Sequence, residues 1–155
     1  MKRRISILLV VLFVLVLFLI SCDSSLKQYD EVAGFVIENR EAIEKIPFNE
    51  LQSDSEKGEK ILKEYFNDDP FVESVYPFSS EVIVFYCGSS GNAQHTEYTG
   101  FYYSKNDSPF GLEFEGEPPI EIQPGVFEYN KSTDAHYVWT KRICDNMFYF
   151  YQKYY

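Results

Sequence analysis

Two cysteine–histidine pairs are the residues whose types and spacing could support nucleophilic catalysis. Cys87 and His95 flank the stretch "GSSGNAQ", so a hairpin loop there would bring the two residues close together at its base. A thiol hydrolase needs a histidine within hydrogen-bond reach of the thiolate. Cys144 and His136 lie on one expected strand at a separation of about 26 Å, taking ~3.3 Å per residue, which is too far for joint action. Cys87 with His95 is therefore the one catalytic hypothesis, beside the alternative of a buried cysteine and a solvated loop histidine.

Residues that could ligate a metal or a phosphate lack the spacing that such sites need. The sequence contains no His-x-x-x-His, no Cys-x-x-Cys and no calcium-loop pattern of carboxylates. The glycines at 88–92 are not followed by a helix, whose N-terminal dipole makes phosphate loops work. The stretch 111–125 is typical of a long, acidic, Pro-rich loop that contains one short strand at most, although its glutamates could collect a cation loosely: Glu113, Glu115, Glu117 and Glu121. We therefore expect no metal site and no cofactor.

Aromatic residues make up 18% of the chain and indicate a binding surface. They concentrate in two expected strands, at 100–104 and 147–155, and strand neighbours point to opposite faces of a sheet. If Phe148 and Phe150 face the helices, an outward-facing binding set remains: Tyr102 (or Tyr103), Trp139, Tyr149 and Tyr151. Exposed tyrosine and tryptophan on a rigid sheet suit recognition of a sugar ring or a partner protein. The alternative is that a loop or the helices of the chain cover this face.

The secondary structure expected from the sequence changes at Pro70, from helices before it to strands after it. Before it, apolar residues recur at three- and four-residue spacing over 28–46, which predicts a helix that ends at Pro47. Ser and Asp N-cap candidates at 53–55 begin a second expected helix that runs to about Asn67.

After Pro70, β-prone runs alternate with turn residues. The clearest run is "EVIVFYC" at 81–87, and others follow at 96–104, 126–130, 135–143 and 147–155. Residues 71–76 are either a strand or an extended segment. Helices followed by strands predict an α+β fold, with two N-terminal helices packed on an antiparallel sheet of about five strands.

The N-terminus resembles a lipoprotein signal peptide. Three basic residues, Lys2 to Arg4, precede 14 apolar residues from Ile7 to Ile20. As a helix this run is about 21 Å long, short of a bilayer core of roughly 30 Å, which favours a cleaved secretory signal over a membrane span. Leu19-Ile20-Ser21-Cys22 resembles the lipobox of bacterial lipoproteins. The resemblance implies cleavage before Cys22 and lipid on its thiol; the alternative is an uncleaved signal anchor.

This resemblance divides the chain into a signal peptide (1–21), a lipidated tether (22–27) and one domain (28–155). Cleavage removes three basic residues and no acidic ones, so the formal net charge falls from −10 to −13. Such a charge repels nucleic acid and suits a domain held at a membrane by lipid rather than by a basic patch. The expected location is the cell membrane or envelope, outside the cytoplasm, where Cys87 and Cys144 either form a disulfide or remain buried thiols.

Together these features predict an envelope lipoprotein that binds a protein partner or a cell-wall glycan through an aromatic sheet face, without catalysis. Two alternatives stay open. One is a thiol-dependent envelope hydrolase that uses Cys87 and His95. The other is an immunity-type lipoprotein that neutralises a basic toxin, with the charge of −13 steering the encounter.

Overall fold

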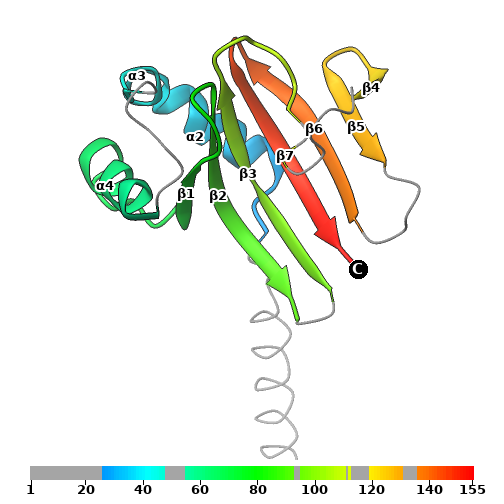
Figure 1. Cartoon of the computed structure of the whole chain (residues 1–155), viewed down its shortest axis with the longest axis horizontal. Coiled ribbons are helices and arrows are strands. Elements are labelled where there is room, and N and C mark those ends of the chain that lie inside the picture. Colours follow the sequence, from blue (N-terminus) through cyan, green and yellow to red (C-terminus); the bar gives the residue numbers. More distant parts are fainter. Residues whose placement is uncertain (1–25, 48–54, 93–94, 111, 113–118, 131–135) are drawn as a thin grey trace, which may run out of the picture.

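A single antiparallel sheet organises the chain (Figure 1). The computed structural model describes residues 26–47, 55–92, 95–110, 112, 119–130 and 136–155. Its seven strands lie in the order β1-β2-β3-β7-β6-β5-β4. The strands are β1 (Ser74–Pro77), β2 (Val82–Gly91), β3 (Thr96–Ser104), β4 (Ile120–Gln123), β5 (Val126–Asn130), β6 (His136–Cys144) and β7 (Met147–Tyr154). The helices are α2 (Tyr29–Glu38), α3 (Arg40–Glu44) and α4 (Ser55–Tyr65).

The α+β class is confirmed, but the prediction of about five strands is wrong. The two strands beyond these five, β1 and β4, have four residues each and form the two edges of the sheet; β1 overlaps the stretch 71–76, which was expected as either a strand or an extended segment. β4 reads Ile-Glu-Ile-Gln and so alternates apolar and polar residues, but all four are exposed and the alternation lasts only four residues. Four residues are too few to distinguish a strand from a loop by periodicity alone.

The helices also differ from the prediction. The single helix expected over 28–46 is divided at Asn39, whose side-chain amide donates to the Phe35 carbonyl oxygen at 2.9 Å. A side chain that bonds its own backbone in this way competes with helix continuation. The second helix, α4, lies against the edge strand β1 rather than on a sheet face (Figure 1). Gly58 allows this contact, because a Cβ there would lie 2.2 Å from the Val75 carbonyl oxygen.

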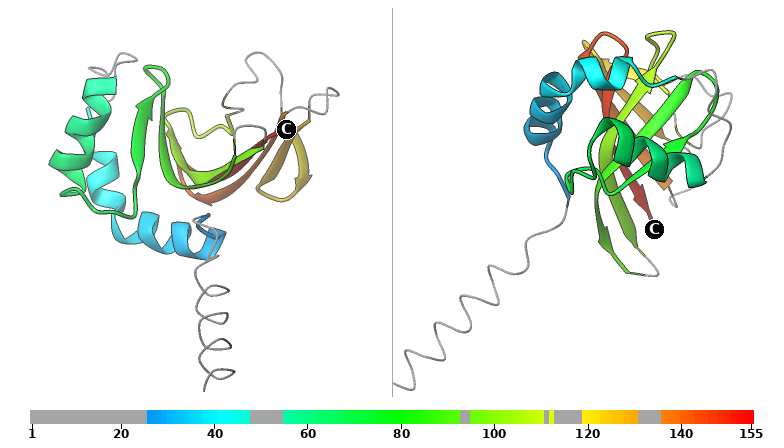
Figure 2. Two further views of the ribbon diagram at one scale, coloured as in Figure 1. Left: turned by 90° about the horizontal axis from the view of Figure 1, so that it is seen from below. Right: turned by 90° about the vertical axis from the view of Figure 1, so that its left-hand side faces the viewer.

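The sheet is curved, and α2 lies on its convex side (Figure 2). We call this side the helix face. Phe85, Phe101 and Tyr149 of the sheet pack there against Val32 and Phe35 of α2. The opposite side, the concave face, has its own cluster of buried residues, which includes Val84, Tyr102, Val138, Phe148 and Phe150. The central strands are therefore buried on both faces.

Several sequence predictions concern residues outside the described part. These are the signal peptide (1–21), Cys22, and the loop residues Glu113, Glu115 and Glu117. Among the described helices, none has the length and apolar character needed to cross a membrane.

Candidate functional site

The structure separates the two residues of the catalytic hypothesis. Cys87 belongs to the core of the helix face and is 1% exposed, with its thiol directed to the Phe85 carbonyl oxygen. His95 lies beyond Gly91, where the pairing of β2 with β3 ends. Four residues of strand separate Cys87 from Gly91, about 13 Å at ~3.3 Å per residue. His95 is therefore beyond hydrogen-bond reach of the thiol.

The environment of Cys87 also opposes nucleophilic chemistry. Burial raises the pKa of its thiol far above the ordinary value, and the nearby Glu73 carboxylate raises this pKa further. A reactive cysteine needs the opposite, a lowered pKa in a partly exposed and electropositive setting. Cys144, half-buried at the end of β6, likewise has a thiol pKa raised mainly by burial. Both cysteines are free thiols.

The predicted aromatic set does not share one face, and the predicted orientation of β7 is reversed. Phe148 and Phe150 lie on the concave face, whereas Tyr149 and Tyr151 point to the helix face. Tyr149 is 5% exposed; its ring contacts Tyr29 of α2 edge-on at 5.6 Å. The prediction assumed one covered and one wet face. β7 lies between β3 and β6 and is buried on both faces. Its alternation of Phe and Tyr therefore does not distinguish a buried face from a solvent-exposed one.

The other two members of the set also lie apart. Trp139 is half-buried on the helix face, where its ring meets Tyr149 edge-on at 5.6 Å. Tyr102 is on the concave face and is 0% exposed, so it is not available as a surface contact. Its hydroxyl accepts a hydrogen bond from the Phe110 backbone N–H and lies 2.9 Å from the Thr140 hydroxyl oxygen. Tyr102 thus fixes the segment after β3 and does not contact solvent.

A groove on the concave face is the candidate site. It has two parts, of 580 and 430 Å³, which share Glu73, Ser74, Tyr86 and Gln152 in their lining and so are continuous. The larger part lies between α4 with β1 on one side and Leu112 on the other. The smaller part crosses β2, β3 and β7.

Three half-buried tyrosines form the wall of the smaller part: Tyr86, Tyr98 and Tyr154. The Tyr98 ring meets Tyr86 edge-on at 5.6 Å and Tyr154 edge-on at 6.0 Å. His136 stacks on Tyr154 at a centroid distance of 4.2 Å. Edge-on and stacked contacts of this kind stabilise the positions of the rings. The rings are therefore held in place before any ligand arrives.

The floor of the groove contains a polar group. Gln152 is 1% exposed, and its side-chain nitrogen lies 2.6 Å from the Tyr154 hydroxyl and 3.0 Å from His136 Nε2. Its Oε1 is the one buried side-chain polar atom of the described residues that has no hydrogen-bond partner. An unpaired buried acceptor costs about 1–3 kcal/mol of stability.

Comparison with protein-family models, with curated proteins and with solved structures finds no match for this chain. The chemistry of the site is therefore deduced from its geometry. The described part of the chain contains no group of three His, Cys, Asp or Glu side chains that could hold a metal ion. What the groove offers is tyrosine rings, hydroxyls, a carboxamide and carboxylates. These groups can stack on a ligand and hydrogen-bond to it.

Sequence reasoning missed the residues of this groove. Tyr98 and Tyr154 lie in strands that were expected. The residues chosen from β7, Tyr149 and Tyr151, lie on the opposite face, whereas Tyr102, chosen from β3, shares the face of Tyr98 but is fully buried. A signal was present in the sequence, since Tyr98 alternates with Tyr102 in one expected strand, and Gln152 and Tyr154 continue the alternate positions of Phe148 and Phe150 in another. It could be used only once the face of one residue in each strand was known.

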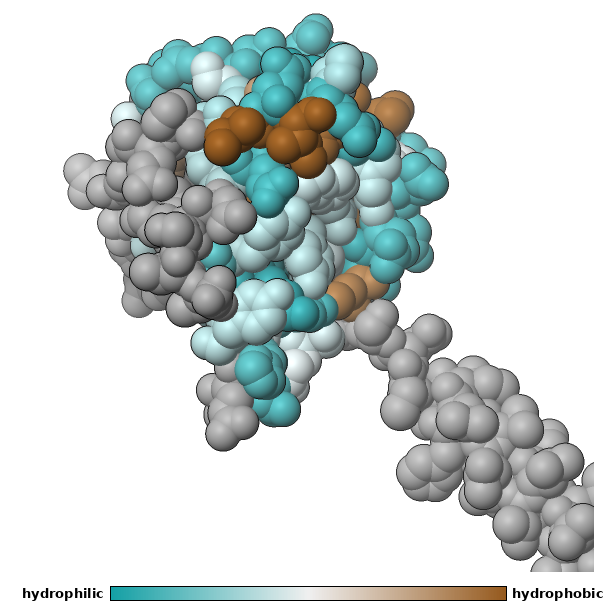
Figure 3. All heavy atoms as spheres, turned by 90° about the vertical axis from the view of Figure 1, so that its right-hand side faces the viewer, coloured by the Kyte–Doolittle hydropathy of each residue, from teal (hydrophilic) through white to brown (hydrophobic). Residues whose placement is uncertain are grey.

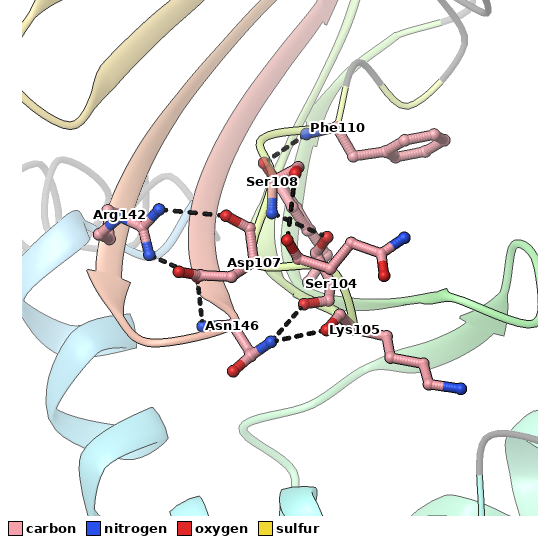
Figure 4. Close-up of polar contacts among 9 residues, drawn as sticks. Ser104, Lys105, Asp107, Ser108, Phe110, Arg142 and Asn146 are labelled. Atoms are coloured by element: carbon pink, nitrogen blue, oxygen red, sulfur yellow. Dashed lines mark hydrogen bonds and ion pairs between the residues drawn. The ribbon is translucent and has the colours of Figure 1, made fainter.

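The segment after β3 covers one end of the concave face and is held there by Asp107 (Figure 4). The Asp107 carboxylate accepts hydrogen bonds from the Arg142 guanidinium and, at 2.7 Å, from the Asn146 backbone N–H. The Asn146 side-chain amide in turn donates to the carbonyl oxygens of Ser104 and Lys105, at 2.8 and 3.0 Å. The network joins the turn after β3 to the β6–β7 turn and so positions the segment that carries Phe110.

We expect Asp107→Asn to destabilise the protein at neutral pH and much less in acid. The Asn146 N–H, and then Arg142, hold the pKa of the Asp107 carboxyl below its usual range. A carboxyl with a lowered pKa contributes stability above its unfolded pKa of about 3.9, and this contribution is lost as the pH falls through the folded pKa. Since the side chain is 44% exposed, we expect about 1 kcal/mol at pH 7. Urea unfolding at pH 7 and pH 3 measures the difference, and Asp145→Asn is the control. An equal loss at both pH values would contradict the assignment.

Proposed function

We propose that this protein is a lipid-anchored envelope lipoprotein that binds a cell-wall glycan in the groove of the concave face, without catalysis. The observation that carries the proposal is the row of half-buried tyrosines, Tyr86, Tyr98 and Tyr154, along a groove with a polar floor. Sugar rings stack their apolar faces on aromatic side chains, and fixed polar groups bind their hydroxyls. Both kinds of contact are available in this groove.

The path of the chain into the domain supports this role. The Lys27 backbone N–H donates to Thr99 Oγ1 at 2.9 Å, and the Tyr149 hydroxyl donates to the Lys27 carbonyl oxygen at 3.3 Å. Both contacts are on the helix face. Cys22 precedes Lys27 by five residues, which span at most about 17 Å. A lipid on Cys22 would therefore bring the membrane to the side of the helix face and leave the concave groove directed away from it.

Charge and surface character narrow the class of ligand. The lining of the groove includes the carboxylates of Glu59 and Glu73 and, among its described residues, neither lysine nor arginine. This favours a neutral or cationic ligand over an anionic one. Figure 3 shows the side of the molecule that carries β4, where Ile120 and Ile122 are 65% and 46% exposed. Apolar surface there occurs as small patches among polar side chains, whereas a protein-docking surface is usually one larger patch.

Sedimentation with isolated cell wall tests the proposal. The full chain, held in a detergent without sugar groups, is mixed with the wall and centrifuged. We expect the native protein to pellet and a folded Tyr98→Ala/Tyr154→Ala variant to bind at least tenfold more weakly, about 1.4 kcal/mol. Tyr137→Ala/Tyr151→Ala removes two half-buried tyrosines from the helix face of β6 and β7 and should pellet like the native chain.

Two outcomes would overturn the proposal. If both double variants pellet like the native protein, the groove does not bind the wall. If folded native protein stays in the supernatant, the ligand is not a wall glycan, and a protein partner, including a basic toxin, becomes the ligand to seek.

A further inference from the structure

The carboxamide of Gln152 is the one feature of the groove that the fold leaves incomplete. Gln152 lies in β7, opposite Tyr98 of β3 and Val138 of β6, and its side chain is almost wholly buried on the concave face. Its nitrogen is held by two partners, while its oxygen has none among the described residues. Buried polar groups are normally paired, so this oxygen indicates a partner that comes from outside the chain.

The two partners of the nitrogen set the direction of the oxygen. His136 of β6 and the Tyr154 hydroxyl hold Nε2 toward β6. The nitrogen and oxygen of a planar carboxamide point away from each other, so Oε1 is turned toward β3 and β2, where Tyr98 and Tyr86 line the groove. Because Gln152 lines both parts of the groove, a ligand that spans them lies along this residue.

The missing partner must be a hydrogen-bond donor, since a carboxamide oxygen can only accept. The larger part of the groove, which Gln152 also lines, includes the apolar side chains of Phe78 and the buried Leu112. Glu73 and Ser74 stand beside both parts of the groove and can accept hydrogen bonds from hydroxyls. The ligand that matches this lining has an N–H donor, a small apolar group next to it, and further hydroxyls.

We propose that Gln152 Oε1 accepts a hydrogen bond from the acetamido N–H of an N-acetylated amino sugar, whose methyl group packs in the apolar part of the groove near Leu112. The inference rests on the proposed function and names the sugar class that the groove selects. A plain hexose would offer a hydroxyl as donor but has no methyl group to fill the apolar part of the groove near Leu112. An acidic sugar would meet Glu59 and Glu73 without a cation among the described lining residues.

Two trisaccharides that differ in one substituent test the proposal. The β-1,4-linked trimers of N-acetylglucosamine and of glucose differ only in carrying an acetamido group or a hydroxyl at C2. Calorimetric titration of the full chain, in the same sugar-free detergent, should show at least tenfold tighter binding of the N-acetylated trimer. Gln152→Met keeps the side-chain length and removes the acceptor. It should reduce the affinity for the N-acetylated trimer at least tenfold and reduce the affinity for the glucose trimer by a smaller factor.

Gln123→Met on the exposed strand β4 is the matched control and should bind both trimers as the native protein does. Equal affinity of the native protein for the two trimers would overturn the selection of an acetamido group, even if Gln152→Met does not fold. An unchanged affinity of folded Gln152→Met for the N-acetylated trimer would overturn the role of Gln152. Failure of the proposed function is a different result: neither trimer binds, and the native protein does not sediment with the cell wall.

Discussion

Replacement of Phe85 by alanine is expected to lower the free energy of unfolding by about 4 kcal/mol. Phe85 is 0% exposed and stacks on Phe101 with a centroid distance of 4.4 Å and an interplanar angle of 7°. It also meets Phe66, just after α4, edge-on at 5.6 Å. The ring thus joins β2 and β3 to the chain segment that leaves α4. Its loss creates a cavity on the helix face that three elements would have to move to fill.

Urea unfolding of Phe85→Ala, Phe85→Leu and Phe127→Ala measures this effect. Leucine keeps most of the buried volume and should cost clearly less than alanine. Phe127 of β5 is only half-buried, on the concave face, so its truncation should be the mildest of the three. A loss for Phe85→Ala no larger than that for Phe127→Ala would show that the helix-face cluster is not the main source of stability.

The strands that could be predicted from the sequence are those whose ends carry turn signals. The run at 126–130 coincides with β5, and 96–104 coincides with β3. Asp145 and Asn146, expected as the turn between the last two strands, connect β6 to β7, with Asn146 at φ 65°. Asparagine tolerates this left-handed conformation better than most residues, so the turn is encoded locally.

The orientation of side chains could not be predicted in the same way. The faces of β7 depend on its pairing with β3, some fifty residues earlier, and with β6, and on the helix and the loop that cover the two sides. A shift of one residue in the assumed face exchanges Tyr149 and Tyr151 for Phe150 and Gln152. The position of Cys87 could not be predicted for a related reason: it was expected at the start of a loop and lies in the core instead.

The groove itself arises from contacts that no local pattern encodes. Tyr86, which lines both parts of the groove, stands opposite Gly100 of β3, and Gly100 pairs on its other side with Phe150 of β7. The end of the groove requires the segment held by Asp107 and Asn146 to cross the concave face. Both features depend on contacts between residues that are distant in sequence, so the site could be recognised only in the folded chain.

Gly100→Ala is therefore expected to damage both the fold and the site. A Cβ at position 100 would lie 2.0 Å from the Phe85 carbonyl oxygen and 2.9 Å from a ring carbon of Phe150. The carbonyl oxygen belongs to the β2 backbone and cannot turn aside, while the Phe150 ring can move only by displacing its edge-on neighbour Tyr86, at 5.5 Å, toward the groove. Overpacking of this kind costs typically 1–3 kcal/mol, and the backbone clash places this change at about 3 kcal/mol or more.

Gly34→Ala provides the matched control, because Gly34 lies in α2 and a Cβ there meets nothing within 4 Å. It should raise stability slightly, since alanine is favoured over glycine in a helix by up to about 1 kcal/mol. The double variant Gly100→Ala/Phe150→Leu removes the ring clash and leaves the backbone clash. Urea unfolding that finds the double variant as stable as the native protein would locate the whole cost in the ring. A folded Gly100→Ala with native stability would mean that β2 and β3 are not this close at Gly100. The arrangement of strands beneath the tyrosine-lined groove would then differ from the one described.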